Sequence, residues 1–268
     1  MGATGRGTRR DAVLPRGWDP VDTAALEAAR DRAARGLYEL VNDPLALRQL
    51  WASDTTRALE LLTGAEPDDS HHVDPSDLFA ASCLAAQPPL DATAEVLHPG
   101  PARTNITRHL LRLASAPPLP HADAATLNTM WDLDRALQPL ADSTNPAGAN
   151  FAAVLCARKR PWHFPLRHPH VRTYLNPHHR LDEPTLEAFS YDIQTFTYLL
   201  ADATIRGLLD ATRRTTRVQL SSENPPCGRW ALGVENLRLL DTLLLNLAIK
   251  AHRLAPAADH EGNHLVHR

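Results

Sequence analysis

Apolar residues recur at intervals of three and four positions through most of this chain, and this spacing constrains its fold more than any other feature. The series that runs from Leu26 to Val41 is one example, and it is typical of a helix with one buried face. Alternation typical of strands is nearly absent, and VQL at 218–220 is the only β-leaning stretch of note. Further helical series occupy 54–64, 105–115, 124–140, 186–209 and 231–253. The pattern predicts an all-α protein.

Aspartate and proline mark several ends of these segments. Asp43-Pro44 and Asp74-Pro75 are each expected to open a helix, since proline is tolerated in the first helical turn. Asp54 is expected to cap a third helix, which ends at Gly64. These local signals predict where helices begin but not how they pack.

Proline-rich joints favour abrupt turns between helices over a parallel coiled coil. They lie at 86–89, 99–101 and 117–120. We therefore predict an orthogonal multi-helix bundle. It forms one helical domain over 18–255, between disordered tails at 1–17 and 256–268 that lack periodic apolar residues.

The charge and cysteine content exclude several classes of protein. The net charge is −3 over 268 residues, which does not favour polyanion binding by the chain as a whole. The three cysteines are far apart, so no disulfide framework or cysteine zinc site is expected, and a cytoplasmic location fits best. Neither a secretory signal nor an apolar run that could span a bilayer occurs. We expect no contact with membranes.

Motifs for cofactors and metals are also missing. The sequence contains no Walker loop and no GxGxxG fingerprint. The pairs His71-His72 and His178-His179 lack the spacing of a helical zinc site. We therefore expect neither a cofactor nor a metal.

One segment stands out by its charge. No acidic residue occurs between Asp142 and Asp182, a stretch that contains six arginines and lysines and five histidines. A turn at 145–148 precedes a helix there, and backbone N–H groups at a helix start favour an anion. We interpret the segment as an anion-binding surface; the alternative is a solvated face whose charges are balanced by acidic neighbours elsewhere in the fold.

This segment supplies all the candidate site residues. As nucleic-acid or anion-binding residues we predict Gly148, Asn150, Arg158, Lys159, Arg160, Trp162, Arg167 and Arg172. Phosphate contacts by such groups position a ligand, and Trp162 could stack on a base or fill the core. If the cluster forms a pocket instead, His168 and His170 are the candidate catalytic acid–base groups.

Two resemblances attach to the same residues. The sequence ARKRP at 157–161, followed by HVR at 170–172, resembles an uncharacterised actinobacterial family of helical proteins of unknown function. This resemblance covers about 75–250 and implies a fold neighbourhood without an activity.

The second resemblance is to helix-hairpin-helix DNA glycosylases. Gly148 matches a hairpin glycine, and the stretch that begins at His168 matches their Asp-Thr-His-Val region at the same separation. This chain departs from the family pattern at two decisive positions. His168 stands where the catalytic aspartate would be, and Asn150 stands where some members have a nucleophilic lysine. The resemblance therefore implies a degenerate helix-hairpin-helix element without glycosylase activity.

Three functions follow as hypotheses. The first is a nucleic-acid-binding protein whose partner is DNA or another polyanion. The second is an enzyme that acts on a small anionic substrate through an Arg/His cluster. The third is a protein-interaction module with an acidic protein partner. Convergence of Arg160, His168 and His170 in one concavity would favour the second.

Overall fold

The structure, a computed structural model, describes residues 14–64, 71–141, 150–177, 185–222 and 229–254. These ranges contain thirteen α-helices, two short 3-10 helices and no strand. The all-α prediction is confirmed. The stretch 218–220 lies inside a helix, α11 (Ala203–Ser222). The predicted hairpin glycine Gly148, residues 1–13 of the predicted N-terminal tail and the whole predicted C-terminal tail lie outside the described residues.

The first helices are α1 (Thr23–Val41), α2 (Pro44–Trp51), α3 (Asp54–Gly64) and α4 (Pro75–Ser82). Asp43 caps α2, and Asp74 caps α4 in a reciprocal capping box with Asp77. The predicted starts at these two aspartates are confirmed. Asp54 instead lies in the first turn of α3, where the Ser53 hydroxyl accepts the Thr56 N–H at 3.1 Å.

The central helices follow the proline joints. They are α5 (Leu90–Leu97), α6 (Pro101–Ala114), the 3-10 helix η1 (Leu119–His121), α7 (Ala124–Leu137) and the 3-10 helix η2 (Gln138–Leu140). Helix α5 had no predicted counterpart between the joints at 86–89 and 99–101. The predicted helix 124–140 continues past α7 only as the tighter turn η2, which contains Pro139.

The last helices are α8 (Phe151–Lys159), α9 (Pro169–Leu175), α10 (Leu186–Ala201), α11, α12 (Arg229–Gly233) and α13 (Asn236–Leu254). The apolar pattern over 186–209 predicted one continuous helix. Asp202 instead adopts an extended conformation, and its carboxylate accepts the Ile205 N–H at 3.0 Å. This cap separates α10 from α11, and 231–253 is likewise divided between α12 and α13.

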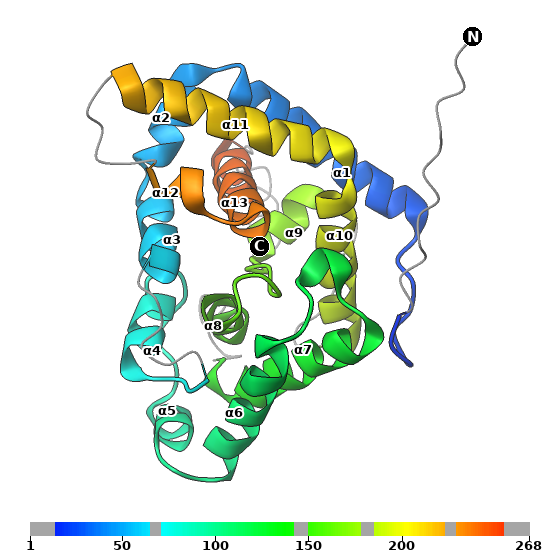
Figure 1. The fold of residues 1–268 in the computed structure, drawn as a ribbon, viewed down its shortest axis with the longest axis vertical. Coiled ribbons are helices and arrows are strands. Elements are labelled where there is room, and N and C mark those ends of the chain that lie inside the picture. The colour runs from blue at the N-terminus through cyan, green and yellow to red at the C-terminus, as the bar shows by residue number, and fades with distance from the viewer. Residues whose placement is uncertain (1–13, 65–70, 142–149, 178–184, 223–228, 255–268) are drawn as a thin grey trace, which may run out of the picture.

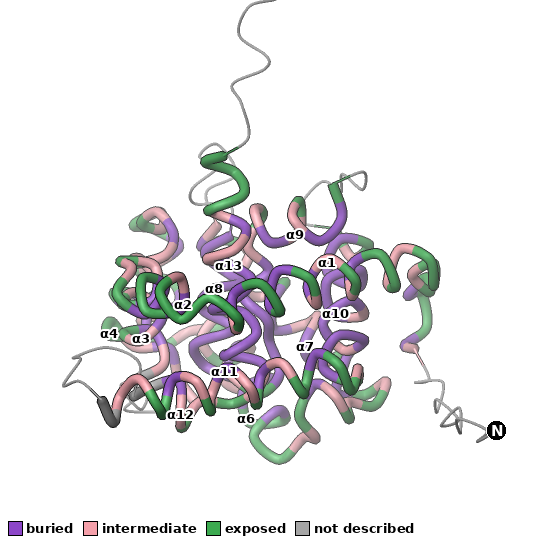
Figure 2. Tube along the Cα trace, turned by 90° about the horizontal axis from the view of Figure 1, so that it is seen from above, coloured by how far each residue is buried: buried purple, intermediate pink, exposed green. Residues whose placement is uncertain are grey.

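Helices α8 and α13 lie inside a frame of other helices. Figure 1 shows α1 and α11 along one edge, α2 to α4 along one side, α6 and α7 at the opposite edge, and α10 along the other side. All nine residues of α8 are buried. One cluster of buried apolar residues extends from Trp18 to Ala248, and Figure 2 shows the buried residues concentrated in the middle of the molecule.

Residues 14–17, which were predicted to belong to a disordered tail, pack against the helices together with the rest of the chain before α1. Leu14 contacts the core, and the Trp18 N–H donates to the Pro15 carbonyl at 3.1 Å. Gly17 supplies the positive φ (88°) of this turn. We call residues 14–22 the N-terminal strap.

Candidate functional site

The basic residues at the end of α8 lie inside the protein. Arg158, Lys159 and Arg160 are each no more than 5% exposed. Arginine and lysine are rarely buried unless they are paired. Their partners therefore decide what the predicted anion-binding segment can do.

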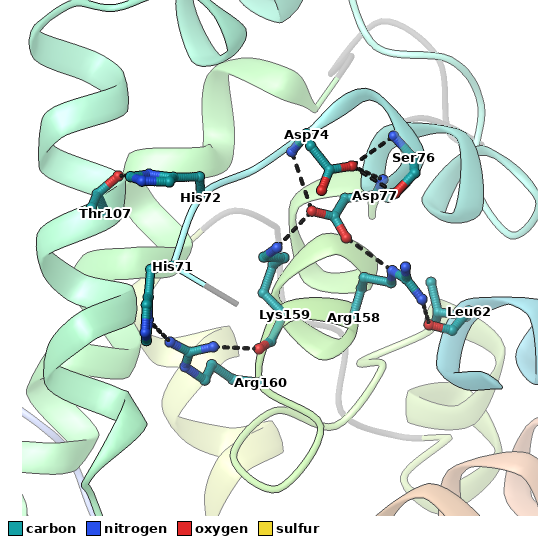
Figure 3. A network of polar contacts seen from close by, with 10 residues as sticks. All are labelled: Leu62, His71, His72, Asp74, Ser76, Asp77, Thr107, Arg158, Lys159 and Arg160. Atoms are coloured by element: carbon teal, nitrogen blue, oxygen red, sulfur yellow. Dashed lines mark hydrogen bonds and ion pairs between the residues drawn. The ribbon is translucent and has the colours of Figure 1, made fainter. Parts of the chain in front are cut away.

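Asp77 of α4 is the partner of two of these cations. It accepts from Arg158 Nε at 3.0 Å and from Lys159 Nζ at 2.7 Å, and its side chain is fully buried (Figure 3). The same carboxylate accepts the Asp74 N–H, as part of the capping box of α4. Arg158 also donates to the Leu62 carbonyl at 2.6 Å. This network ties α3, α4 and α8 together.

Arg160 is held by carbonyl oxygens. Its Nε donates to the Leu110 carbonyl of α6 at 3.1 Å, and its Nη1 donates to the Lys159 carbonyl at 2.7 Å. Nη2 lies 3.5 Å from His71 Nδ1. The guanidinium thus joins the Leu110 carbonyl of α6 to the last carbonyl of α8, which the helix leaves without an intrahelical partner.

The remaining buried arginines meet aspartates from other helices. Arg167 pairs with Asp134 of α7 and lies over the Phe189 ring, 4.8 Å from its centroid. Arg172 donates from Nε to Asp192 of α10 at 3.0 Å. These contacts join the segment to α7 and α10.

A fifth pair lies next to the same segment. Arg238 Nη1 lies 2.8 Å from Asp241 Oδ2 on α13, and the Asp241 carboxylate accepts the Leu166 N–H at 3.3 Å. Burial raises the pKa of the Asp241 carboxyl to about 7 and lowers the pKa of the Arg238 guanidinium. Arg238 also donates to the Phe164 carbonyl, so this pair supports the loop between α8 and α9.

Within residues 150–177, the part of the basic segment that the structure describes, the arginines and the lysine do not form a positive surface. The side chains of Arg158, Lys159, Arg160 and Arg167 are buried, and phosphate could reach them only by displacing their present partners. The alternative is correct in that acidic neighbours from other helices balance the charges, but it is wrong in that these side chains are buried and not solvated. The sequence did not indicate these pairs because the carboxylates belong to α4, α7 and α10, outside the acid-free window.

The buried aspartates Asp77, Asp134, Asp192 and Asp241 could have been recognised from their positions in the sequence. Asp134, Asp192 and Asp241 each stand within an apolar helical series, where a lone carboxylate requires a buried partner. Asp77 follows Asp74 by three positions, which is the spacing of a capping box. A lone carboxylate in an apolar helical series therefore predicts a buried ion pair, but it does not predict which cation is the partner.

The other predicted binding residues are dispersed. Asn150 is buried at the start of α8 and makes no side-chain capping bond. The Trp162 side chain is 51% exposed, while its carbonyl accepts the Leu119 N–H at 2.9 Å. Trp162 is thus the one described member of the predicted set with a largely accessible side chain.

The two candidate catalytic histidines have structural contacts. His168 is the N-cap of α9, where its Nδ1 accepts the His170 N–H at 3.2 Å. The His170 ring stacks on His252 of α13, with 4.5 Å between centroids. Burial and His252 lower the pKa of His170. The position matched to the glycosylase aspartate therefore caps a helix.

Three of the predicted residues meet at a small cavity. Arg167, His168 and Arg172 border a cavity of about 10 Å³, which is room for one water molecule. Neither Arg160 nor His170 lines it. This cavity is too small for a substrate and does not bring Arg160, His168 and His170 together.

A much larger cavity lies beside the N-terminal strap. Its volume is about 620 Å³, which is typical of a small-molecule site. Its walls come from the strap, from α1, from the two residues that follow α9, and from the first turns of α10. None of the predicted site residues lines it, and no motif in the sequence indicated it.

Gln194 of α10 holds the strap in place. Its amide oxygen accepts the Val21 N–H at 3.1 Å, and its amide nitrogen donates to the Asp19 carbonyl at 2.9 Å. Trp18 adds an edge-to-face contact with Phe189, 5.7 Å between centroids. The strap wall of the cavity is therefore built by specific contacts.

The lining combines apolar, aromatic and charged groups. Trp18 and Tyr191 supply aromatic surface, and Asp19, Glu187 and Arg32 supply charge. Burial is the main cause that raises the pKa of Tyr191 to about 12, so this phenol stays protonated at neutral pH. Such a lining suits a small organic molecule that has both an apolar part and a charge.

Among the described residues, no group of three or more His, Cys, Asp or Glu side chains is arranged to hold a metal ion. No helix in the described ranges has the length and hydropathy required to cross a membrane.

Comparison with known proteins gives one family. A family model described as "Family of unknown function (DUF6308)" matches residues 53–247. The predicted resemblance to an uncharacterised family is thereby confirmed, whereas the bacterial group and the glycosylase likeness stay predictions. No curated protein and no solved structure matches the chain. All five buried ion pairs lie within the matched range, and the strap and α1 precede it.

Proposed function

The chain belongs to this family of unknown function, and we propose that it binds a small organic molecule in the cavity between the strap, α1 and α10. The observation that carries the proposal is the 620 Å³ cavity with its mixed aromatic and polar lining. Part of its wall lies before residue 53, where the family match begins. The proposal therefore concerns this chain and not the whole family.

Fewer observations support nucleic-acid binding than support a small-molecule ligand. The guanidinium groups that predicted it are committed to buried partners, and only Trp162 of the described set is largely accessible. Binding to short duplex and single-stranded DNA at low salt tests that prediction, since phosphate contacts weaken steeply as salt rises.

The small-molecule proposal is tested by a fragment screen on the full chain. A set of neutral, cationic and anionic fragments at millimolar concentration is added to ¹⁵N-labelled protein. We expect saturable shifts of the Val21 and Tyr191 amide signals, because these residues line the cavity. If no fragment moves these signals, the proposal is overturned.

A filling variant localises the binding. Ala28 of α1 lines the cavity, and Ala28→Trp should abolish the shifts by occupying the space. Ala24→Trp is the matched control, since Ala24 is exposed on the same helix and outside the lining. Equal binding by both variants would place the fragments elsewhere and refute the proposal.

A further inference from the structure

Carboxylates outnumber cations around the large cavity. Asp19, Asp22 and Glu187 line it together with one guanidinium, that of Arg32. Arg32 Nη1 is already engaged, because it donates to the Leu175 carbonyl at 2.8 Å. Asp22 is engaged as the N-cap of α1, where its carboxylate accepts the Ala24 N–H.

The other two carboxylates, Asp19 and Glu187, are exposed, and neither is a helix N-cap. Within the described ranges, neither Asp19 nor Glu187 forms an ion pair. They come from different elements, the strap and the first turn of α10, and both reach the same cavity. Two uncommitted negative charges therefore face a space in which Arg32 supplies the only lining guanidinium or ammonium group.

Aromatic rings complete the lining. Trp18 and Tyr191 are each 6% exposed, and both line the cavity beside the aliphatic Leu186. These rings offer apolar contact to a ligand whose charge meets the carboxylates, and Ala25 and Ala28 leave room for its apolar part.

We propose that the ligand is an organic cation, an amine carried on an aromatic or aliphatic group, with its charge near Asp19 and Glu187 and its apolar part against Trp18 and Tyr191. This inference rests on the proposed function and adds the charge of the ligand to it. An anionic ligand would face two carboxylates with one committed guanidinium. The cavity therefore selects against small anionic ligands.

Three indoles of similar size separate charge from shape. Tryptamine is a cation, tryptophol is neutral and indole-3-propionate is an anion at neutral pH. Binding to the full chain is measured by calorimetry and by the Val21 amide shift. We expect tryptamine to bind roughly tenfold more tightly than tryptophol, and indole-3-propionate to bind most weakly. Added salt should weaken tryptamine binding selectively.

Charge variants assign the preference to named groups. Asp19→Asn and Glu187→Gln should each weaken tryptamine binding by roughly twofold to fivefold and leave tryptophol binding unchanged. Glu27→Gln is the matched control, because Glu27 is exposed on α1 and outside the lining.

The outcomes distinguish the two proposals. If all three indoles bind equally and Ala28→Trp blocks them, the cavity binds small molecules without charge selection, and only the cation inference fails. If none binds the cavity and the fragment screen is also negative, the proposed function fails with it. Preference for indole-3-propionate would overturn the cation inference outright.

Discussion

Asp77 is the carboxylate on which two buried cations depend. Replacing it with alanine leaves Arg158 and Lys159 without their shared counter-charge in a fully buried position. Removing one partner of a buried ion pair costs about 3–5 kcal/mol. We therefore expect Asp77→Ala to lower the free energy of unfolding by that amount in urea denaturation.

The matched control for Asp77 is an exposed carboxylate. Glu95 is exposed on α5, and Glu95→Gln should change stability by less than about 0.5 kcal/mol. Equal effects of the two substitutions would show that the network around Asp77 does not stabilise the fold.

The Asp241 carboxyl makes the free energy of unfolding depend on pH. Burial raises the pKa of this carboxyl in the folded chain to about 7, above the value of about 4 in an unfolded chain. Folding therefore takes up a proton between these two values, and stability falls as pH rises through this window. The loss should approach at most about 1.4 kcal/mol per pH unit.

The Asp241→Asn variant isolates that term, because it lacks the titrating group. The difference in unfolding free energy, wild type minus variant, should decrease from pH 5 to pH 7 and level off above this. Urea unfolding at each pH measures it. An increase over the same range would contradict the raised pKa.

Helix α9 depends on an unusual cap. His168 Nδ1 accepts the His170 N–H, which requires an imidazole with that nitrogen unprotonated. Aspartate is a better N-cap and its charge suits a helix N-terminus. We expect His168→Asp to stabilise the protein by about 0.5 kcal/mol and His168→Ala to destabilise it by about 1 kcal/mol.

The cap prediction is checked by urea midpoints of the three proteins. His121→Ala is the control, since His121 is exposed in η1 and should leave the midpoint unchanged. A lower midpoint for His168→Asp than for His168→Ala would show that the position serves something other than the cap.

The strap extends the helical domain, and its attachment can be tested apart from global stability. Gln194→Ala removes both side-chain bonds to the backbone of Asp19 and Val21. We expect amide hydrogen exchange to increase over 15–25, with little change in α13, because the strap opens locally. Binding of tryptamine should weaken as well, since one wall of the cavity is released.

Thr197→Ala is the control for the strap prediction. The Thr197 hydroxyl donates to the Ile193 carbonyl within α10 and does not contact the strap. If Gln194→Ala and Thr197→Ala give the same exchange over 15–25, Gln194 does not hold the strap.

Local patterns account for the helices. Apolar spacing, Asp43 and Asp74 as caps, and the glycine at the end of α3 are all features of short stretches, so a sequence displays them directly. Errors arose where a break lies within an apolar series. The separation at Asp202 depends on a single capping carboxylate, which apolar periodicity does not report.

The sequence by itself therefore determined a helical chain, most of its helix positions and one charged segment. Only tertiary structure decided the role of that segment, because Asp77, Asp134 and Asp192 reach it from helices distant in the chain. The large cavity also depends on the tertiary structure, because its lining comes from residues 17–32 and 176–191, which are far apart in the sequence. Pairing and space both depend on which helices meet, and no local pattern encodes that.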